Sequence, residues 1–275
     1  MQCHYRLQEE KTMITELNHV GIVAGAVEEN LNFYVDILGG KVVNEGYIEA
    51  SNTKCIYVQL ASGIIELLCR GNEKDRVNLG LNHVCFLTDD LDGDYEKLLA
   101  AGFVFTSPPK VAGSGDGRLT FLTDSIGTRV ELIQRDQSYK NPKVEGRILS
   151  FDHISLSAHD LQAAESFYTE KMGMKELKRM RVDATDLTMV YLNYGEDVIE
   201  LLNRPNQQPV SPPIGHIALR VDNVDEMGEY LASRGVEILQ GFPKQAGTGI
   251  GRITMVKDPN GARIEFVDRK DLREL

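Results

Sequence analysis

Four histidines and four glutamates recur along the chain at nearly constant spacing. They are His19, Glu66, His83, Glu131, His153, Glu200, His216 and Glu265. Each histidine is followed by a glutamate 47 to 49 positions later, and both residue types stand in short apolar stretches. Imidazole nitrogens and carboxylate oxygens together suit Ni²⁺, Co²⁺, Zn²⁺, Mn²⁺ or Fe²⁺, with coordination positions left for water or substrate. A single such histidine is more often a hydrogen-bonded core residue, but four matched pairs favour up to two divalent metal ions per chain.

The glutamates lie in segments that otherwise resemble buried strands. The turn sequence Asp258-Pro259-Asn260-Gly261 is followed by residues 262–267, in which apolar and charged side chains alternate around Glu265. Similar apolar flanks surround the other three glutamates. Because an unpaired buried carboxylate is costly, these positions need a partner, and a metal ion is a suitable one.

An internal repeat determines the domain organisation. The histidines of residues 17–20 and 151–154 are 134 positions apart, as are Glu66 and Glu200, and Glu131 and Glu265. A repeat of this length indicates two copies of one domain. We therefore expect an N-terminal extension at residues 1–13, domains at 14–135 and 148–270, and a polar linker at 136–147.

Each copy divides again into two units that must position one histidine and one glutamate. A strand with the histidine precedes a helix, and the glutamate lies in the last of three following strands. The helices begin near Val27, Leu91, Leu161 and Val224 and end before glycines. The expected fold class is therefore α+β, with four strand–helix–three-strand modules.

Composition excludes several classes of partner. The chain has 275 residues with 42% apolar content and a formal charge of −11. The excess of acidic residues disfavours binding to nucleic acid or anionic membranes. No apolar stretch reaches membrane-spanning length and the start of the chain does not resemble a signal peptide, so a cytoplasmic enzyme or binding protein is expected.

Two arginines in each half accompany the glutamates. Arg70 and Arg204 follow Glu66 and Glu200 by four residues, and Arg129 and Arg263 precede Glu131 and Glu265 by two. On a regular strand these offsets place each arginine on the same face as its glutamate. They could bind a substrate carboxylate or phosphate through bidentate contacts, or they could be solvated at the rim of the sheet.

The repeat and its ligand pattern resemble the vicinal oxygen chelate superfamily, which includes glyoxalase I, methylmalonyl-CoA epimerase, extradiol dioxygenases and bleomycin-resistance proteins. The resemblance is closest to glyoxalase I, most clearly across residues 215–222 and 258–261. It implies βαβββ modules whose curled mixed sheets surround a metal held by one His/Glu pair from each of two modules. It also implies that Glu131 and Glu265 act as the proton-shuttling bases, with Glu66 and Glu200 as the opposite ligands.

The chemistry implied is that of a lyase or isomerase acting on a small molecule that can carry an anionic group. A metal that holds the oxygens of an α-hydroxycarbonyl compound stabilises the enediolate formed when the neighbouring C–H loses its proton. A metal-bound carboxylate that can loosen becomes a base within reach of that carbon. The alternatives are an epimerase of the methylmalonyl-CoA type, an Fe²⁺-dependent extradiol dioxygenase and a non-catalytic sequestering protein.

Some residues depart from the glyoxalase I pattern. The arginine that contacts glutathione in that family corresponds to Val23 and Ser157, and a family asparagine corresponds to Arg70 and Arg204. The choice of thiol cofactor therefore stays open. Dioxygenases keep three ligands in one half and a histidine shortly before the last strand, whereas this chain has a fourth ligand, Glu200, and no histidine after His216.

The spacing leaves open how the eight ligands group. Pairing within each half or across the halves would both give two His₂Glu₂ sites. The relatives implied by the resemblance are dimers with sites between subunits, so we expect pairing across the halves, with Glu265 and His216 joined to His19. The chain itself could be a monomer or a homodimer.

Overall fold

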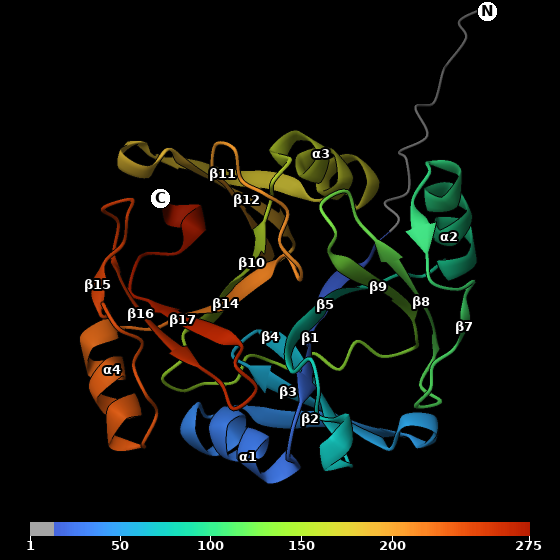
Figure 1. The fold of residues 1–275 in the computed structure, drawn as a ribbon, viewed down its shortest axis with the longest axis horizontal. Helices are drawn as coiled ribbons and strands as arrows, with labels where there is room; N and C mark the ends of the chain where they lie inside the picture. The colour runs from blue at the N-terminus through green and yellow to red at the C-terminus, as the bar shows by residue number, and fades with distance from the viewer. Residues whose placement is uncertain (1–13) are drawn as a thin grey trace, which may run out of the picture.

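The computed structural model describes residues 14–275, so the predicted extension at residues 1–13 lies outside the described residues. Each half of the molecule is one curled, mixed β-sheet with helices on its outer side (Figure 1). The first half contains β1 (Glu16–Ala24), α1 (Val27–Leu31), β2 (Lys41–Ile48), β3 (Thr53–Leu60), β4 (Gly63–Arg70), β5 (Gly80–Leu87), α2 (Leu91–Ala100), β6 (Val104–Phe105), β7 (Lys110–Val111), β8 (Arg118–Thr123) and β9 (Arg129–Gln134). The second half contains β10 (Ser150–Ser157), α3 (Leu161–Ser166), β11 (Lys175–Val182), β12 (Leu187–Tyr194), β13 (Asp197–Asn203), β14 (Ile214–Arg220), α4 (Val224–Ser233), β15 (Lys244–Gln245), β16 (Arg252–Lys257) and β17 (Arg263–Val267).

The two modules of a half share one continuous sheet. The strand order is β2-β3-β4-β1-β5-β9-β8-β6 in the first half, with β7 paired to β8. In the second half it is β11-β12-β13-β10-β14-β17-β16-β15. The antiparallel pairs β1–β5 and β10–β14 join the modules, while β1–β4 and β5–β9 are parallel. The four central strands of each sheet are therefore the ones that carry the four ligands of that half.

The helices begin where the sequence predicts, but two of them change their hydrogen-bonding pattern. After α1 and α3 the backbone continues as π-helix over Asn32–Ile37 and Phe167–Lys171. There Leu38 N–H donates to the carbonyl of Phe33, and Met172 N–H to that of Phe167, five residues back. The wider turn coincides with two adjacent buried aromatic residues, Phe33 and Tyr34 in the first half.

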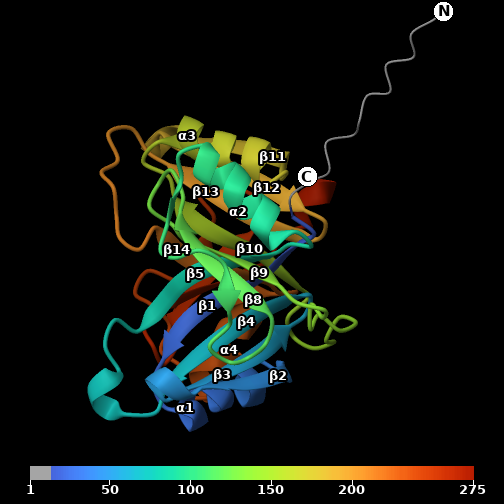
Figure 2. The ribbon, with the colours of Figure 1, turned by 90° about the vertical axis from the view of Figure 1, so that its right-hand side faces the viewer.

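The two halves pack against each other through their helices. In both views α1 lies beside α4 and α2 beside α3 (Figures 1 and 2). Tyr230 of α4 donates a 2.9 Å hydrogen bond to the carbonyl of Ile37, and the rings of Phe103 and Phe167 are 4.9 Å apart. One hydrophobic core runs through both halves. Among the described residues, no helix is long and apolar enough to cross a membrane.

Candidate metal centres and substrate cavity

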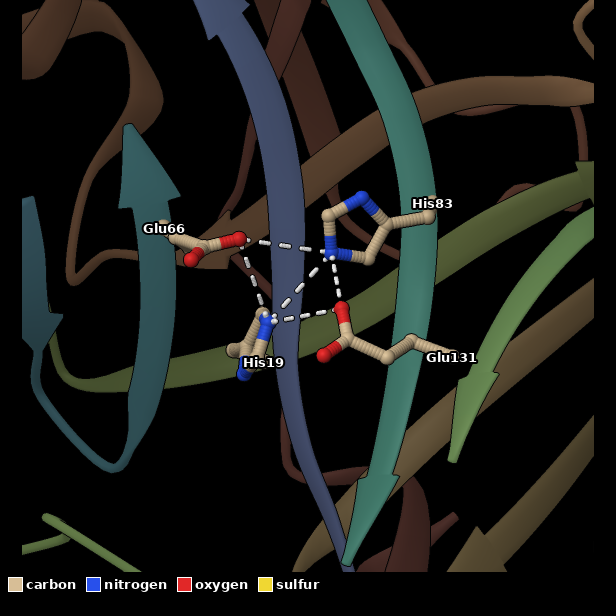
Figure 3. A group of neighbouring side chains, drawn as sticks. All are labelled: His19, Glu66, His83 and Glu131. Atoms are coloured by element: carbon tan, nitrogen blue, oxygen red, sulfur yellow. Dashed lines mark hydrogen bonds and ion pairs between the residues drawn. The ribbon is translucent and has the colours of Figure 1, made fainter. Parts of the chain in front are cut away.

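The first site comprises His19, Glu66, His83 and Glu131, which lie on β1, β4, β5 and β9. Their side chains converge on one point (Figure 3). The Nε2 atom of His83 lies 3.0 Å from Glu131 and 3.4 Å from Glu66, and the Nε2 atom of His19 lies 3.5 Å from Glu66. All four residues are buried.

The second site comprises His153, Glu200, His216 and Glu265, on β10, β13, β14 and β17. The Nε2 atom of His153 lies 3.3 Å from both Glu200 and the Nε2 atom of His216, which is itself 3.8 Å from Glu200. Ligand atoms of the two histidines and Glu265 lie within 4.8 Å of one another. The set is looser than the first, and both His216 and Glu265 are partly exposed.

The candidate ligands therefore gather within each half, and the expected grouping across the halves is wrong. The cause is the strand order. Because β1 pairs with β5 and β10 with β14, the two modules of one half form one curled sheet and supply a complete set. A site joining His19 to His216 and Glu265 would instead need strands of different halves at the centre of one sheet.

The donor chemistry of both sites fits a divalent cation. In the first site the Nδ1 atoms of His19 and His83 contact the side-chain oxygens of Asn18 and Asn82 at 2.8 and 3.0 Å. The Nε2 atoms therefore face the centre of the site, 3.4 Å apart, together with two carboxylates. Two imidazole nitrogens and two carboxylate oxygens are a suitable set for the metals expected from the sequence.

Residues directly before the histidines hold the rings, and sequence reasoning overlooked their role. Asp152 contacts His153 Nδ1 at 2.7 Å and accepts a 2.5 Å contact from Arg269. Its counterpart Asn18 accepts a 2.7 Å hydrogen bond from Arg135. Such outer partners fix the tautomer and orientation of a ligating histidine. The sequence contains a signal for this role, because a side chain with an acceptor oxygen stands immediately before three of the four histidines.

Buried charges shift the pKa values of the first-site residues. Burial opposes ionisation of Glu66, but hydrogen bonds from His19 and His83 hold its pKa well below the usual range. Burial likewise opposes protonation of His83, yet Glu131 and Glu66 raise the pKa of this histidine to about 9. The pocket therefore favours the charged forms of oppositely charged groups, as expected where a cation can take the place of protons.

In the second site the pKa values of the two histidines are shifted in opposite directions. Burial lowers the pKa of His216 to about 4 and raises that of Glu265 to about 7. Burial also disfavours charge on His153, but Glu200 and Asp152 raise its pKa to about 10. His153 in turn holds the pKa of Glu200 below its usual range against the effect of burial.

A cavity of about 700 Å³ opens onto the second site and includes all four of its ligands in its walls. Apolar side chains, among them Met180, Met189, Leu202, Phe242 and Met255, form much of the lining. A pocket of this size and character is typical of a small-molecule site. In the first half, a smaller hollow of about 250 Å³ is lined by Tyr57, Asp116 and Tyr139, and by none of the ligands.

The four arginines singled out in the sequence separate into two pairs. Arg204 and Arg263 line the cavity of the second site. Arg129 stacks on Phe121 at 3.7 Å from the ring centre. Arg70 donates a 3.0 Å hydrogen bond to Thr53 and borders a different hollow of the first half, of about 290 Å³.

Comparison with known proteins agrees with this architecture. The family model described as the Glyoxalase/Bleomycin resistance protein/Dioxygenase superfamily matches residues 16–132 and 150–266. A lactoylglutathione lyase of Arabidopsis thaliana, GLX1, is 25% identical over 272 residues, covering 94% of this chain and 93% of that protein.

Two solved structures share the fold. A Mn(II)-bound glyoxalase of Novosphingobium aromaticivorans superposes with a TM-score of 0.67 and 20% identity, covering 95% of this chain and 85% of that one. The 2,3-dioxygenase LapB of Pseudomonas sp. KL28 gives a TM-score of 0.66 and 17% identity, covering 93% and 92%.

The chain belongs to the Glyoxalase/Bleomycin resistance protein/Dioxygenase superfamily, as two tandem domains. The expected family and the α+β fold with curled mixed sheets are confirmed. The predicted domain boundaries at residues 14–135 and 148–270 stay a prediction.

Proposed function

We propose that this protein is a metal-dependent lyase or isomerase of the glyoxalase I type, and that it acts at the second site. The observation that carries the proposal is the cavity of about 700 Å³ whose walls contain His153, Glu200, His216 and Glu265. The names of the full-length relatives, which are lactoylglutathione lyases, support the same class. These names favour a lyase or isomerase of the glyoxalase I type over ring cleavage, epimerisation and sequestration.

In this proposal His153, Glu200, His216 and Glu265 would hold one divalent ion, which would supply polarisation of the substrate's carbonyl oxygen. Glu265 would take the proton from the hydroxyl-bearing carbon next to that carbonyl and return it to the carbonyl carbon, while the hydroxyl proton moves to the former carbonyl oxygen. Substrate atoms are only rearranged, so no oxidant or reductant is needed. Glu200, on the opposite strand pair, serves mainly as a ligand.

The cavity also favours a class of substrate. Arg204 and Arg263 supply positive charge beside the ligands, whereas the remaining walls carry several methionines, leucines and Phe242. An adduct with an anionic group and an apolar body matches this lining. Ser157, which stands where a glutathione-contacting arginine is expected, lines the same cavity and accepts a 2.5 Å hydrogen bond from Gln207.

The test is a rate measurement on the full chain reconstituted with Ni²⁺, Co²⁺, Zn²⁺ or Mn²⁺ in turn. The probes are the hemithioacetals that methylglyoxal forms with glutathione, cysteine and coenzyme A. We expect thioester formation with at least one thiol, and a loss of roughly 10²–10⁴-fold in Glu265→Gln, the range typical of a missing general base. Glu131→Gln is the matched control and should retain the rate.

Other outcomes would redirect the assignment. Oxygen consumption with a catechol probe in the Fe²⁺-loaded protein would favour ring cleavage. If Glu265→Gln turned over as fast as the unaltered chain, Glu265 would not be the base.

A further inference from the structure

The first site has a complete ligand set but differs from the second in what surrounds it. Its His19, Glu66, His83 and Glu131 side chains are only 0% to 8% exposed. The His216 side chain of the second site is 12% exposed and faces the large cavity. The two halves otherwise share one topology, so the cause must lie in the residues around the ligands.

We propose that the first site is a closed structural metal centre that takes no substrate, and that side chains of the linker and of residues 112–117 seal it. The proposal rests on the metal-dependent function above. It assigns Glu131 the role of ligand only, in contrast to the catalytic role expected from the sequence.

One side of the first site is covered by stacked aromatic and cationic groups. The ring of Tyr57 lies edge-on to His19 with centroids 5.4 Å apart, and Tyr139 of the linker lies 5.7 Å beyond it. The guanidinium of Arg135 sits 4.3 Å from the ring centre of Tyr139. Asp116 links Arg135 to Tyr139, because its carboxylate accepts a 3.2 Å hydrogen bond from Arg135 and a 2.8 Å hydrogen bond from Tyr139.

The other side is covered by Phe121 and Arg129. Phe121 meets the His83 ring edge-on at 5.6 Å, and the Arg129 guanidinium lies 3.7 Å above the Phe121 ring. Asn82 anchors this arginine by accepting a 2.6 Å hydrogen bond from it. The same Asn82 oxygen contacts Nδ1 of His83, so one side chain positions both a ligand and its cover.

The second half keeps Tyr191 and Arg269, the counterparts of Tyr57 and Arg135, with Tyr191 edge-on to His153 at 5.5 Å, but it lacks the other covering groups. At the repeat offset of 134, Ile250 replaces Asp116 and Arg273 replaces Tyr139, so the acid–tyrosine link cannot form. Met255 replaces Phe121, and Gly215, at the local offset of 133, replaces Asn82. Without that amide acceptor Arg263 is free to face the cavity, where Ile250, Met255 and Gly215 are also found.

A further difference sits beneath the second histidine of each half. Gly21 lies directly under His83, where a built Cβ would stand 2.0 Å from the ring. Its counterpart in the second half is Ser155, whose Oγ is buried without a hydrogen-bond partner among the described residues. The serine side chain takes space that the first half leaves to the histidine ring, in agreement with the looser second set. A closed site with all protein ligands in contact is typical of structural metal ions, and an open position is typical of catalytic ones.

The first experiment follows metal release from the full chain. Protein loaded with Zn²⁺ is transferred to excess EDTA, and the metal retained is measured over time by elemental analysis. We expect two equivalents at the start, one released quickly and one released far more slowly. Thermal unfolding of the species with one retained ion should occur at a higher temperature than that of the metal-free chain, because an ion bound only to the folded state stabilises it.

Two sets of variants assign the slow equivalent. Gly21→Ala should turn the slow equivalent into a fast-releasing one, because the new methyl group displaces His83 as the Ser155 side chain displaces the corresponding histidine of the second half. The pair Asp116→Ile with Tyr139→Arg copies the second half and should speed the slow release by roughly 10–100-fold, the effect typical of losing groups that position metal ligands. Ile250→Ala is the matched control in the second half and should leave the slow phase unchanged.

The outcomes separate this proposal from the proposed function. Two ions released at one fast rate, with turnover at the second site intact, would overturn the sealed centre alone. A slow phase that Gly21→Ala leaves unchanged would also overturn it, because the slowly released ion would then belong to the second site. Protein that binds no metal at all would overturn both.

Discussion

Tyr34 of the first half donates a 2.8 Å hydrogen bond to the carboxylate of Asp258 in the second half, and both residues are buried. Asp258 opens the turn that leads into β17, the strand that carries Glu265. Its other carboxylate oxygen accepts the backbone N–H groups of Asn260 and Ala262 at 2.8 and 2.7 Å. The symmetry-related contact joins Tyr168 to Asp124, also at 2.8 Å. The π-helical segment of one half thus fixes the turn that presents a glutamate in the other.

Replacing Tyr34 by Phe should therefore weaken both folding and turnover. The change removes one hydrogen bond from Oδ2 of Asp258, which keeps the 2.8 Å bond from Asn260 Nδ2, and losing a hydrogen bond to a charged group costs about 1.5–3 kcal/mol in the free energy of unfolding. Denaturant titration measures that cost, and kinetics of the metal-loaded protein measures turnover. Tyr168→Phe is the matched control, since its turn precedes β9 of the sealed site; it should cost similar stability while sparing turnover. Equal losses of turnover in the two variants would contradict the idea that the contact positions Glu265.

Gly215→Asn should give Arg263 a hydrogen-bond acceptor like the one that Asn82 offers to Arg129. A Cβ built at Gly215 meets nothing closer than 3.7 Å, so the side chain is tolerated. If Arg263 binds an anionic group of the substrate, diverting it should raise KM by roughly 10–100-fold, as expected from losing a charge-assisted hydrogen bond of about 1.5–3 kcal/mol. Steady-state kinetics should show kcat little changed. Asn82→Gly in the first half is the control and should leave KM as it was.

Asp152→Asn should weaken metal binding at the second site. The carboxylate holds His153 Nδ1 at 2.7 Å, and a neutral amide supports the ligand less strongly. Loss of such a partner typically costs about 10–100-fold in metal affinity. Competition with a chromophoric chelator measures the affinity. An unchanged fast-releasing equivalent would show that Asp152 only orients Arg269.

The pH dependence of stability should contain a contribution from Asp197, which pairs with Lys140 of the linker at 2.6 Å. Burial raises the pKa of this carboxyl to about 6 despite the lysine. Because the folded pKa lies above the unfolded value of about 3.9, the contribution to stability is complete below pH 4 and is lost as the pH rises through 6.

Relative to Asp197→Asn, the unaltered chain should therefore lose roughly 2–3 kcal/mol of unfolding free energy between pH 4 and 7. Denaturant titrations of the metal-free proteins across this range measure the difference. A difference that does not vary with pH would mean that Lys140 fully compensates the burial.

The eight candidate ligands stand out in the sequence because their signal is periodic; that they bind metal stays a prediction. A His and a Glu repeated four times at one spacing identify both the residues and the modules. The structure gathers all four residues of the first set and His153, His216 and Glu265 of the second, with Glu200 3.3 Å from His153. The start of each helix could likewise be placed from apolar spacing and terminal glycines. The continuation of α1 and α3 as π-helix could not, because these segments place Tyr34 and Tyr168 against Asp258 and Asp124 of the opposite half, a long-range contact that local spacing does not encode.

The grouping of the ligands was beyond reach of the sequence for a different reason. Spacing specifies which strands carry ligands but not which strand becomes the neighbour of β1, and the β1–β5 pair decides this. The unequal surroundings of the two sites were also missed. They depend on single differences such as Asn82 and Gly215, whose importance appears only once Arg129 and Arg263 are placed beside them.

Fusing two domains in one polypeptide allows the two sites to evolve separately. In a homodimer of a single domain, each substitution appears in both copies, so a glycine that opens one pocket would open the other as well. Here Gly21 and Asn82 coexist with Ser155 and Gly215 because each residue is encoded once. Mutations in the open half can therefore explore new substrates while the other half continues to hold the molecule together.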